Sequence, residues 1–190
     1  MCIRDSLYQK LPAFTKGYLD AIIAAQQHVY GEFLIPGLLN DTILSDMQKS
    51  VPYAPNEDGI ETPCYIYANY FLARKLAELD RTAILKKLSA AHQVKLYTNN
   101  PTPQLPKVEN MGAIDYYEIM PLVFQHSKIN LNITLRSIQK GIPLRAFDIM
   151  GSGGFLLTNY QEDFLNYFVP GEDFIYYSSY EEAETYADYY

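Results

Sequence analysis

The sequence predicts an α/β protein, in which a helical segment is followed by a parallel sheet with flanking helices. Apolar residues recur at helical spacing through residues 7–92, and from residue 93 onward short apolar runs alternate with helical patterns. Hydrophobic residues make up 48% of the 190 residues, which is enough to build a packed core. Because strands that alternate with helices favour right-handed crossovers, we expect the strands of the second part to lie parallel.

The net charge and the cysteines exclude several classes of protein. A formal net charge of −7 argues against a nucleic-acid-binding protein, which needs a basic face to release counterions from phosphates. No uninterrupted apolar run approaches the roughly 20 residues of a membrane span. Cys2 and Cys64 form neither a CxxC pair nor a zinc-ligand spacing, so we expect a reduced, cytoplasmic protein.

Both ends of the chain have the character of cut ends. The first six residues, MCIRDS, resemble a translated transposon-adapter sequence, and no apolar run of a signal peptide follows them. The last helical pattern stops at Tyr190 without a cap. We therefore expect residues 1–6 to be an assembly artefact and the chain to be a fragment whose native start lies further upstream.

Residues 7–92 are expected to form either an interdomain segment or the end of an amino-terminal half. The first helical pattern ends at Gly31, and Asn40 or Asp41 is a plausible N-cap of the second. Asp80 is a candidate N-cap that divides the last helical stretch in two. The expected helices span residues 11–31, 40–50, 64–79 and 80–92, with a proline-bearing loop over 52–63.

Residues 93–190 are expected to form the sheet domain, truncated at its carboxyl end. A proline-bearing loop occupies residues 99–110. The expected strands span residues 93–98, 112–117, 128–134, 153–158 and 172–177, and the expected helices span 117–127, 143–152, 161–168 and 179–190. Ligands of open parallel sheets bind beyond the carboxyl ends of the strands, so we look for the site there.

The third expected strand carries polar side chains toward its carboxyl end. Asn130, Asn132 and Thr134 alternate with apolar residues. Asparagine is depleted in buried strands because its amide must find partners there. Two interpretations follow: these side chains line a polar crevice, or they satisfy the backbone of neighbouring loops.

Three glycines, Gly151, Gly153 and Gly154, lie between the expected helix 143–152 and the next strand. A phosphate-binding glycine loop needs the opposite order, with a strand before the glycines and a helix after them. A helix C-terminus carries a partial negative charge and repels phosphate. We therefore expect the glycines to form a helix cap in the αL conformation and a tight entry into the strand.

The opposite end of that helix is the candidate anion site. Pro143 is expected at the first helical position, and Gly141 before it lets a ligand approach the backbone closely. The free N–H groups of the first turn can meet an anion, Arg145 offers a guanidinium fork, and Asp148 can accept hydrogen bonds from sugar hydroxyls. The alternative is an ordinary intrahelical pair between Arg145 and Asp148, which are three residues apart.

Three blocks resemble a known family: MPLVFQHSKINLNIT, GIPLRAFDIMGSGGFLLT and YFVPGEDFIYYSSYEEAE. In this order they are similar to the donor-binding half of GT-B glycosyltransferases of the group 1 type. The greatest similarity is to the spore maturation protein CgeB-like branch. The resemblance covers residues 93–190 strongly and the helical part more loosely.

The resemblance implies a GT-B fold of two Rossmann-like halves, with a nucleotide-sugar held by the carboxyl-terminal half without a metal. Asp148 matches the second of two family acids and is expected to hold the donor ribose. Lys140 stands where the first acid is expected, which is a departure from the pattern. With the crevice residues included, the expected donor-binding residues are Asn132, Thr134, Gly141, Ile142, Pro143, Arg145 and Asp148.

The implied function is that of a hexosyltransferase-like glycosyltransferase. The full-length enzyme is expected to transfer a sugar from a nucleotide donor to an acceptor whose identity (glycan, protein or small molecule) stays open. No catalytic residue is assigned, because the base of an inverting enzyme of this fold usually comes from the amino-terminal half. The alternative function is a non-catalytic nucleotide-sugar-binding module or an α/β interaction module.

Overall fold

A computed structural model describes residues 7–53 and 59–190. The chain divides into two compact units. Unit 1 runs to Glu78 and includes Leu135–Ser137, and unit 2 comprises Leu79–Thr134 and Ile138–Tyr190. The expected artefact at residues 1–6 lies outside the described residues, as does the central part of the expected loop 52–63, residues 54–58.

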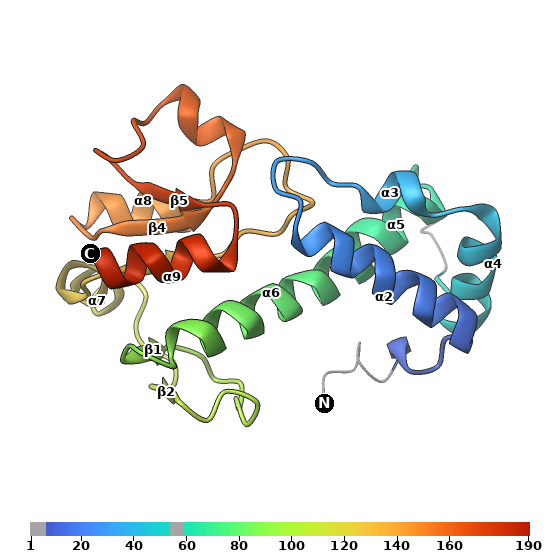
Figure 1. Ribbon diagram of the computed structural model, residues 1–190, viewed down its shortest axis with the longest axis horizontal. Coiled ribbons are helices and arrows are strands. Elements are labelled where there is room, and N and C mark those ends of the chain that lie inside the picture. The colour runs from blue at the N-terminus through green and yellow to red at the C-terminus, as the bar shows by residue number, and fades with distance from the viewer. Residues whose placement is uncertain (1–6, 54–58) are drawn as a thin grey trace. The chain divides into compact units, whose positions relative to one another are not determined.

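Unit 1 is helical, as the sequence predicts. The side chain of Asn40 accepts a hydrogen bond from the backbone N–H of Ile43 and so caps α4. Thr62 caps α5 in the same way, and Pro63 follows at the first helical position. The helices are α2 (Ala13–Gln27), α3 (Ile35–Leu38), α4 (Asp41–Ser50), α5 (Pro63–Ile66), the π-helix η1 (Tyr67–Leu72) and the first part of α6 (Ala73–Leu88) (Figure 1).

The predicted break at Asp80 is wrong, because α5, η1 and α6 form one continuous helical stretch from Pro63 to Leu88. Asp80 is 2% exposed and accepts a hydrogen bond from the hydroxyl of Tyr180 at 2.6 Å. A partner one hundred residues away therefore satisfies the carboxylate within the helix. Within η1 the hydrogen bonds span five residues, as in the bond from the N–H of Ala73 to the carbonyl of Ala68.

The described part of unit 1 contains a buried cation, Arg136. Arg136 is 6% exposed and lies 3.3 Å from the ring centroid of Tyr30. It also donates a hydrogen bond to the carbonyl of Val29 at 3.1 Å. Burial removes the hydration that stabilises a guanidinium, and attraction to an aromatic face replaces part of that stabilisation.

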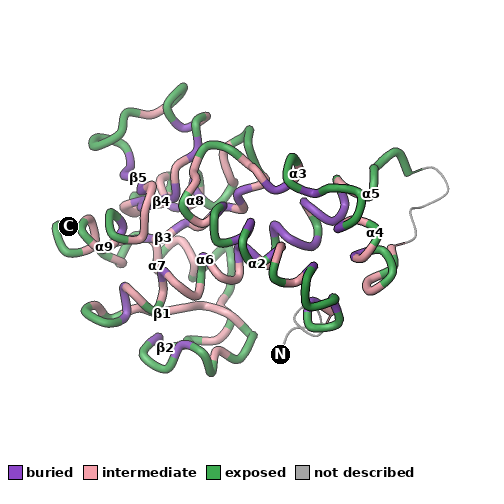
Figure 2. The backbone as a smooth tube through the Cα atoms, turned by 45° about the vertical axis from the view of Figure 1, so that its right-hand side comes forward, coloured by how far each residue is buried: buried purple, intermediate pink, exposed green. Residues whose placement is uncertain are grey.

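Unit 2 is an α/β unit whose parallel strands are flanked by helices, as predicted. Its strands are short, and in the described part of the chain they form two sheets rather than one: β1–β2 and β3–β4–β5. Figure 2 shows the burial of the larger sheet, in which all four residues of β4 are buried. The strands are β1 (Val94–Leu96), β2 (Val108–Asn110), β3 (Asn130–Asn132), β4 (Leu156–Asn159) and β5 (Ile175–Tyr177).

The second predicted strand, residues 112–117, is wrong. Its place in the sheet is taken by β2, which lies inside the predicted loop 99–110 and pairs with β1 in parallel. The carboxylate of Asp115 instead accepts the backbone N–H groups of Tyr117 and Glu118 at 2.9 and 2.6 Å. Such side-chain bonds to the following backbone form a turn and compete with strand pairing.

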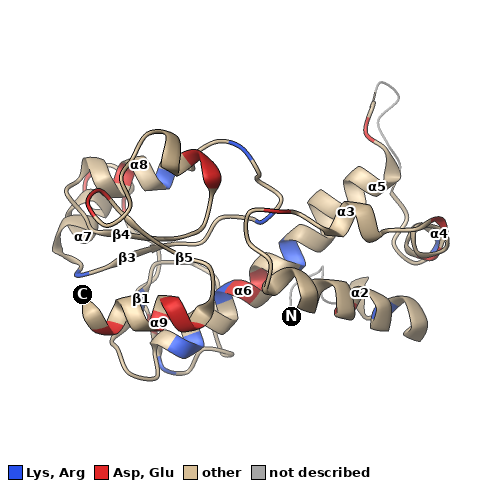
Figure 3. Cartoon of the chain, turned by 45° about the horizontal axis from the view of Figure 1, so that its top comes forward, with Lys and Arg blue, Asp and Glu red and all other residues tan. Residues whose placement is uncertain are grey.

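Helices lie on both faces of the three-stranded sheet. Figures 1 and 3 place α8 (Leu144–Gly151) on one face and α9 (Tyr180–Tyr189) on the other. Ala146 and Ile149 of α8 pack with Leu156 of β4 in a core cluster that also contains aromatic residues. The remaining elements are α7 (Met120–His126), which replaces a predicted helix that began at residue 117, and the 3-10 helix η2 (Glu162–Asn166).

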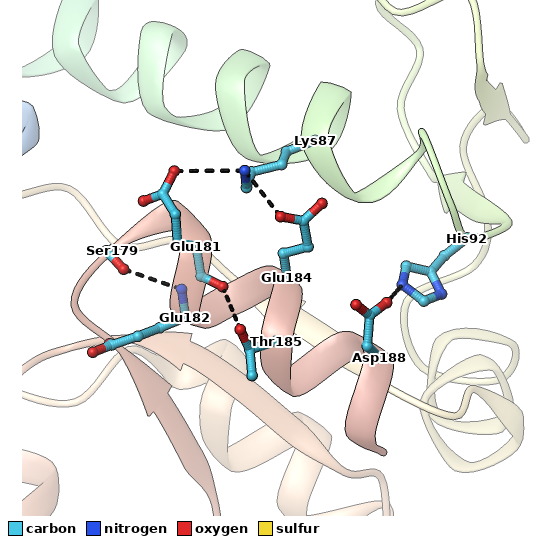
Figure 4. A network of polar contacts seen from close by, with 8 residues as sticks. All are labelled: Lys87, His92, Ser179, Glu181, Glu182, Glu184, Thr185 and Asp188. Carbon is cyan, nitrogen blue, oxygen red and sulfur yellow. Dashed lines mark hydrogen bonds and ion pairs between the residues drawn. The ribbon is translucent and has the colours of Figure 1, made fainter.

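Polar contacts join α9 to the second part of α6 (Figure 4). Lys87 contacts Glu184 at 2.9 Å and Glu181 at 3.5 Å. Near the other end of α9, His92 contacts Asp188 at 2.8 Å. The side chains are half exposed or exposed, so these contacts add little to stability.

The glycines after α8 form the predicted helix cap. The N–H of Gly153 donates to the carbonyl of Met150 and that of Gly154 to Ile149, both at 2.9 Å, which is the Schellman pattern. Gly153 has a φ of 76°, the left-handed conformation that glycine adopts without strain. These glycines therefore end the helix and begin β4.

None of the helices in the described ranges is both long enough and apolar enough to cross a membrane.

Candidate functional site

The carboxyl ends of β3 and β4 are joined by a buried polar network. The amide of Asn132 donates to the hydroxyl oxygens of Thr134 and Thr158, each at 3.0 Å. The backbone N–H of Thr134 donates to the side-chain oxygen of Asn159 at 2.7 Å. All four residues are at most 6% exposed. This network fixes the chain as it leaves β3 toward α8.

The predicted crevice residues therefore take structural partners. The amide of Asn130 donates to the carbonyl of Phe124 at 2.9 Å, which is the second interpretation, satisfaction of a neighbouring backbone. Asn132 and Thr134 lie at the expected edge of the sheet, but their polar atoms face each other and β4. Asn132 and Thr134 therefore hold the ends of β3 and β4 together next to the candidate site.

The turn before α8 carries an internal anion. Gly141 has a φ of 91°, and its backbone N–H donates to the carboxylate of Asp163 on η2. Lys140 lies beside it, 3.0 Å from Glu162 and 3.8 Å from Asp163. A carboxylate therefore already binds the backbone amide of Gly141, one of the expected donor-binding residues.

Helix α8 begins one residue later than predicted. Pro143 is the N-cap, with a φ of −61° and a ψ of 139°, and not the first helical residue. No side chain caps this end, so the first N–H groups of an eight-residue helix lack a side-chain partner. Ile142 is partly buried against the core cluster, so its side chain packs inward.

Arg145 and Asp148 are not paired with each other, which excludes the predicted alternative of an intrahelical ion pair. Asp148 accepts a hydrogen bond from the hydroxyl of Tyr116. Arg145 is exposed in the first turn of α8 and forms no ion pair with any residue of the ranges 7–53 and 59–190. Within these ranges, the positive end of the helix thus presents a cation without a counterion.

Tyr116 is a site residue that sequence reasoning missed, because it lies in the wrongly predicted strand 112–117. Its hydrogen bond to Asp148 raises the pKa of the Tyr116 phenol, and desolvation and the negative charge of Asp148 act in the same direction. The charge of Arg145 lowers that pKa in part. Because Asp148 binds the hydroxyl of Tyr116 and lies one helical turn after Arg145, the three residues form one cluster.

Arg81 of α6 is a second residue that the sequence did not single out. Its guanidinium Nη2 donates to the carbonyl of Ile133, directly after β3, at 3.4 Å. Desolvation lowers the pKa of Arg81, the charge of Arg145 lowers it further, and Asp80 opposes both. The only sequence signal was a basic residue in a helix, which has no specificity for a site.

The part of the chain that the structure describes holds no group of three or more His, Cys, Asp or Glu side chains arranged to bind a metal ion. The positive groups of the site are thus the helix N-terminus and the two arginines, and its acceptors are carboxylates and hydroxyls. Figure 3 shows the basic and acidic segments on α8. Such an arrangement can bind an anion beside a group that carries hydroxyls.

Comparisons with known proteins give the family. No curated protein matches the chain, and no solved structure matches it. A family model described as glycosyl transferase-like matches residues 73–190, which is more than half of the chain and contains every residue of the cluster. The chain therefore belongs to the glycosyl transferase-like family.

Proposed function

We propose that this chain binds a nucleotide-sugar at the amino-terminal end of α8 and forms the donor-binding half of a GT-B glycosyltransferase of the CgeB-like branch. The full-length enzyme transfers the sugar, a hexose, to an acceptor. Membership of the glycosyl transferase-like family supports sugar transfer in general. The cytoplasmic location stays a prediction.

The observation that carries the proposal is the exposed Arg145 without a counterion at the start of α8. The N-terminus of an α-helix carries a partial positive charge, and no side chain caps this one, although the N–H of Ala146 donates to the carbonyl of Pro143 at 2.9 Å. The N–H groups of Leu144 and Arg145 can meet an anion. A guanidinium fork matches two phosphate oxygens. Together these groups suit the diphosphate of a nucleotide-sugar and supply its positive charge, so we expect binding without a divalent cation.

Asp148 supplies the contact to the ribose. Its carboxylate already accepts a hydrogen bond from a hydroxyl, that of Tyr116. An ionised carboxylate has about four acceptor positions, so a ribose hydroxyl can bind beside the phenol. The position of Asp148, one helical turn after Arg145, sets the ribose next to the phosphates.

The same groups favour sugar transfer. When the glycosidic bond breaks, the departing nucleoside diphosphate gains negative charge. Positive groups held in place at that position stabilise the transition state more than the ground state. The acceptor hydroxyl needs a base in an inverting reaction, and we assign no residue of this chain to that role.

The proposal is tested by calorimetric titration of the chain with UDP, GDP, ADP, CDP and dTDP in buffer that contains EDTA. We expect at least one to bind, and Asp148→Ala to weaken it by about 1.5–3 kcal/mol, the contribution of a hydrogen bond to a charged group. Glu172→Ala, an exposed acid on the turn before β5, is the matched control and should leave binding unchanged.

Unchanged affinity of Asp148→Ala would refute the ribose assignment. Absence of binding by every nucleoside diphosphate would refute the proposal and support an α/β interaction module instead. Transfer or hydrolysis of a donor by a full-length clone separates the enzyme from a module that only binds nucleotide-sugars.

A further inference from the structure

We propose that Arg81 of α6 is a second phosphate-binding residue, which holds the donor diphosphate together with Arg145. This inference rests on the proposed function of the same site and adds a contact from a helix that lies outside the resembling blocks. It also assigns the diphosphate to side chains rather than to the turn at Gly141.

The position of Arg81 is fixed by a backbone contact at the edge of the sheet. Its Nη2 atom donates to the carbonyl oxygen of Ile133, the first residue after β3, at 3.4 Å. That edge is where β3 and β4 end and where the chain leads into α8. A guanidinium has five N–H donors, and this long contact uses one of them.

Arg81 and Arg145 each bring a positive charge to the site, and neither forms an ion pair with a residue of the described ranges. Desolvation lowers the pKa of Arg81, the charge of Arg145 lowers it further, and the charge of Asp80 raises it in part. A bound anion between the guanidinium groups would turn the repulsion into attraction for both.

The neighbouring acid, Asp80, offsets the charge of Arg81 only in part, and its carboxylate also binds another residue. Asp80 is 2% exposed, and its carboxylate accepts a hydrogen bond from Tyr180 at 2.6 Å. Successive residues of an α-helix point about 100° apart, so the exposed Arg81 and the buried Asp80 leave the helix in different directions. Asp80 thus holds α9, and Arg81 stays available at the sheet edge.

A diphosphate is the anion that fits two guanidinium groups. Each of its two phosphoryl groups can accept a bidentate pair of hydrogen bonds from one arginine. The backbone amide that might have served instead, that of Gly141, is occupied by Asp163. Arg81 therefore supplies a contact that the turn does not.

The test compares pyrophosphate, the nucleoside diphosphate that binds best, and its nucleoside, each titrated into the whole chain by calorimetry. Arg81→Gln should weaken the two phosphate ligands by about tenfold or more, the loss expected for a charge-assisted bond, and should leave the nucleoside unchanged. Arg81→Lys keeps the charge and should restore part of the loss. Arg74→Gln removes the same charge from an earlier turn of α6 and should bind like the parent.

The outcomes separate this inference from the proposed function. If the parent binds a nucleoside diphosphate and Arg81→Gln binds it equally well, the inference is overturned and the proposed function stands. If the parent binds neither pyrophosphate nor any nucleoside diphosphate, both are overturned. If the Gln variant does not fold, the Lys variant decides: its pyrophosphate affinity must fall while its nucleoside affinity does not, since a purely structural role would change both or neither.

Discussion

Substitution of Gly154 by alanine should destabilise unit 2 because the added methyl group has no room. An ideal Cβ at this position would lie 2.7 Å from the amide nitrogen of Asn130 and 2.7 Å from the carbonyl oxygen of Phe124. The same two atoms are hydrogen-bonded to each other at 2.9 Å. The methyl group must therefore push the backbone apart or displace the amide.

The expected cost follows from these two effects. Overpacking costs about 1–3 kcal/mol, and the partly buried carbonyl of Phe124 costs up to about 3 kcal/mol more when it loses its donor. Since the two penalties relieve each other in part, we expect about 2–4 kcal/mol. For a chain of this size each kcal/mol lowers the melting temperature by about 2–4 °C.

Two neighbouring glycines provide the controls in urea and thermal unfolding followed by circular dichroism. Nothing lies within 4 Å of a Cβ added to Gly151, the last residue of α8, so Gly151→Ala should be neutral or stabilise by up to about 1 kcal/mol. Gly153 has space but a φ of 76°, so Gly153→Ala should cost about 1–2 kcal/mol. The reasoning is refuted if Gly154→Ala is as stable as Gly151→Ala.

The remaining predictions concern the hydroxyls of Tyr67 and Tyr180 and the ion pairs of Lys87. Burial raises the pKa of Tyr67 above its ordinary value of 10.0, so the folded state keeps a proton that the unfolded state releases, and stability should fall as the pH rises above 10.0. Tyr67→Phe should make the stability fall less steeply with pH above 10.0, and an unchanged pH dependence would contradict the raised pKa of Tyr67. Since the Tyr67 hydroxyl donates to Gln48 at 2.8 Å, the same substitution should cost about 1–3 kcal/mol of stability at pH 8 in urea unfolding. Tyr180→Phe removes a donor from the buried Asp80 and should cost about 1–3 kcal/mol, whereas Lys87→Met breaks exposed ion pairs and should cost less than about 1 kcal/mol. A larger loss of stability for Lys87→Met than for Tyr180→Phe in the same assay would show that burial does not decide how much each polar contact contributes.

The elements around α8 were predictable because local rules determine them. The order of helix, glycines and strand allowed only a helix cap between Met150 and Leu156, and the structure has one. Asn40, one of the two candidate caps with Asp41, caps α4 for a similar reason, since an N-cap bonds to an amide three residues away. Sequence patterns therefore located the carboxyl end of α8 and placed its amino-terminal end, where the candidate site lies, within one residue.

The errors arose where a distant partner decides the local structure. The strand β2 exists because β1 pairs with it, and its sequence Val108–Asn110 has no strand signal that distinguishes it from a loop. Asp80 has the residue type of a cap, but Tyr180 satisfies it inside a helix. Only folding brings Tyr116 to Asp148 and Arg81 to the carbonyl of Ile133.

The π-helix η1 has a consequence for how this protein tolerates changes in chain length. In Tyr67–Leu72 each backbone hydrogen bond joins residues five positions apart, whereas in an α-helix it joins residues four positions apart. As a result Tyr67 and Leu72, five positions apart, are both buried. The geometry equals that of an α-helix with one residue added. A single deletion within this stretch should restore a plain α-helix and keep the buried faces at both ends aligned. A deletion in the regular helix after it would rotate every later residue by about 100° and turn apolar side chains toward water.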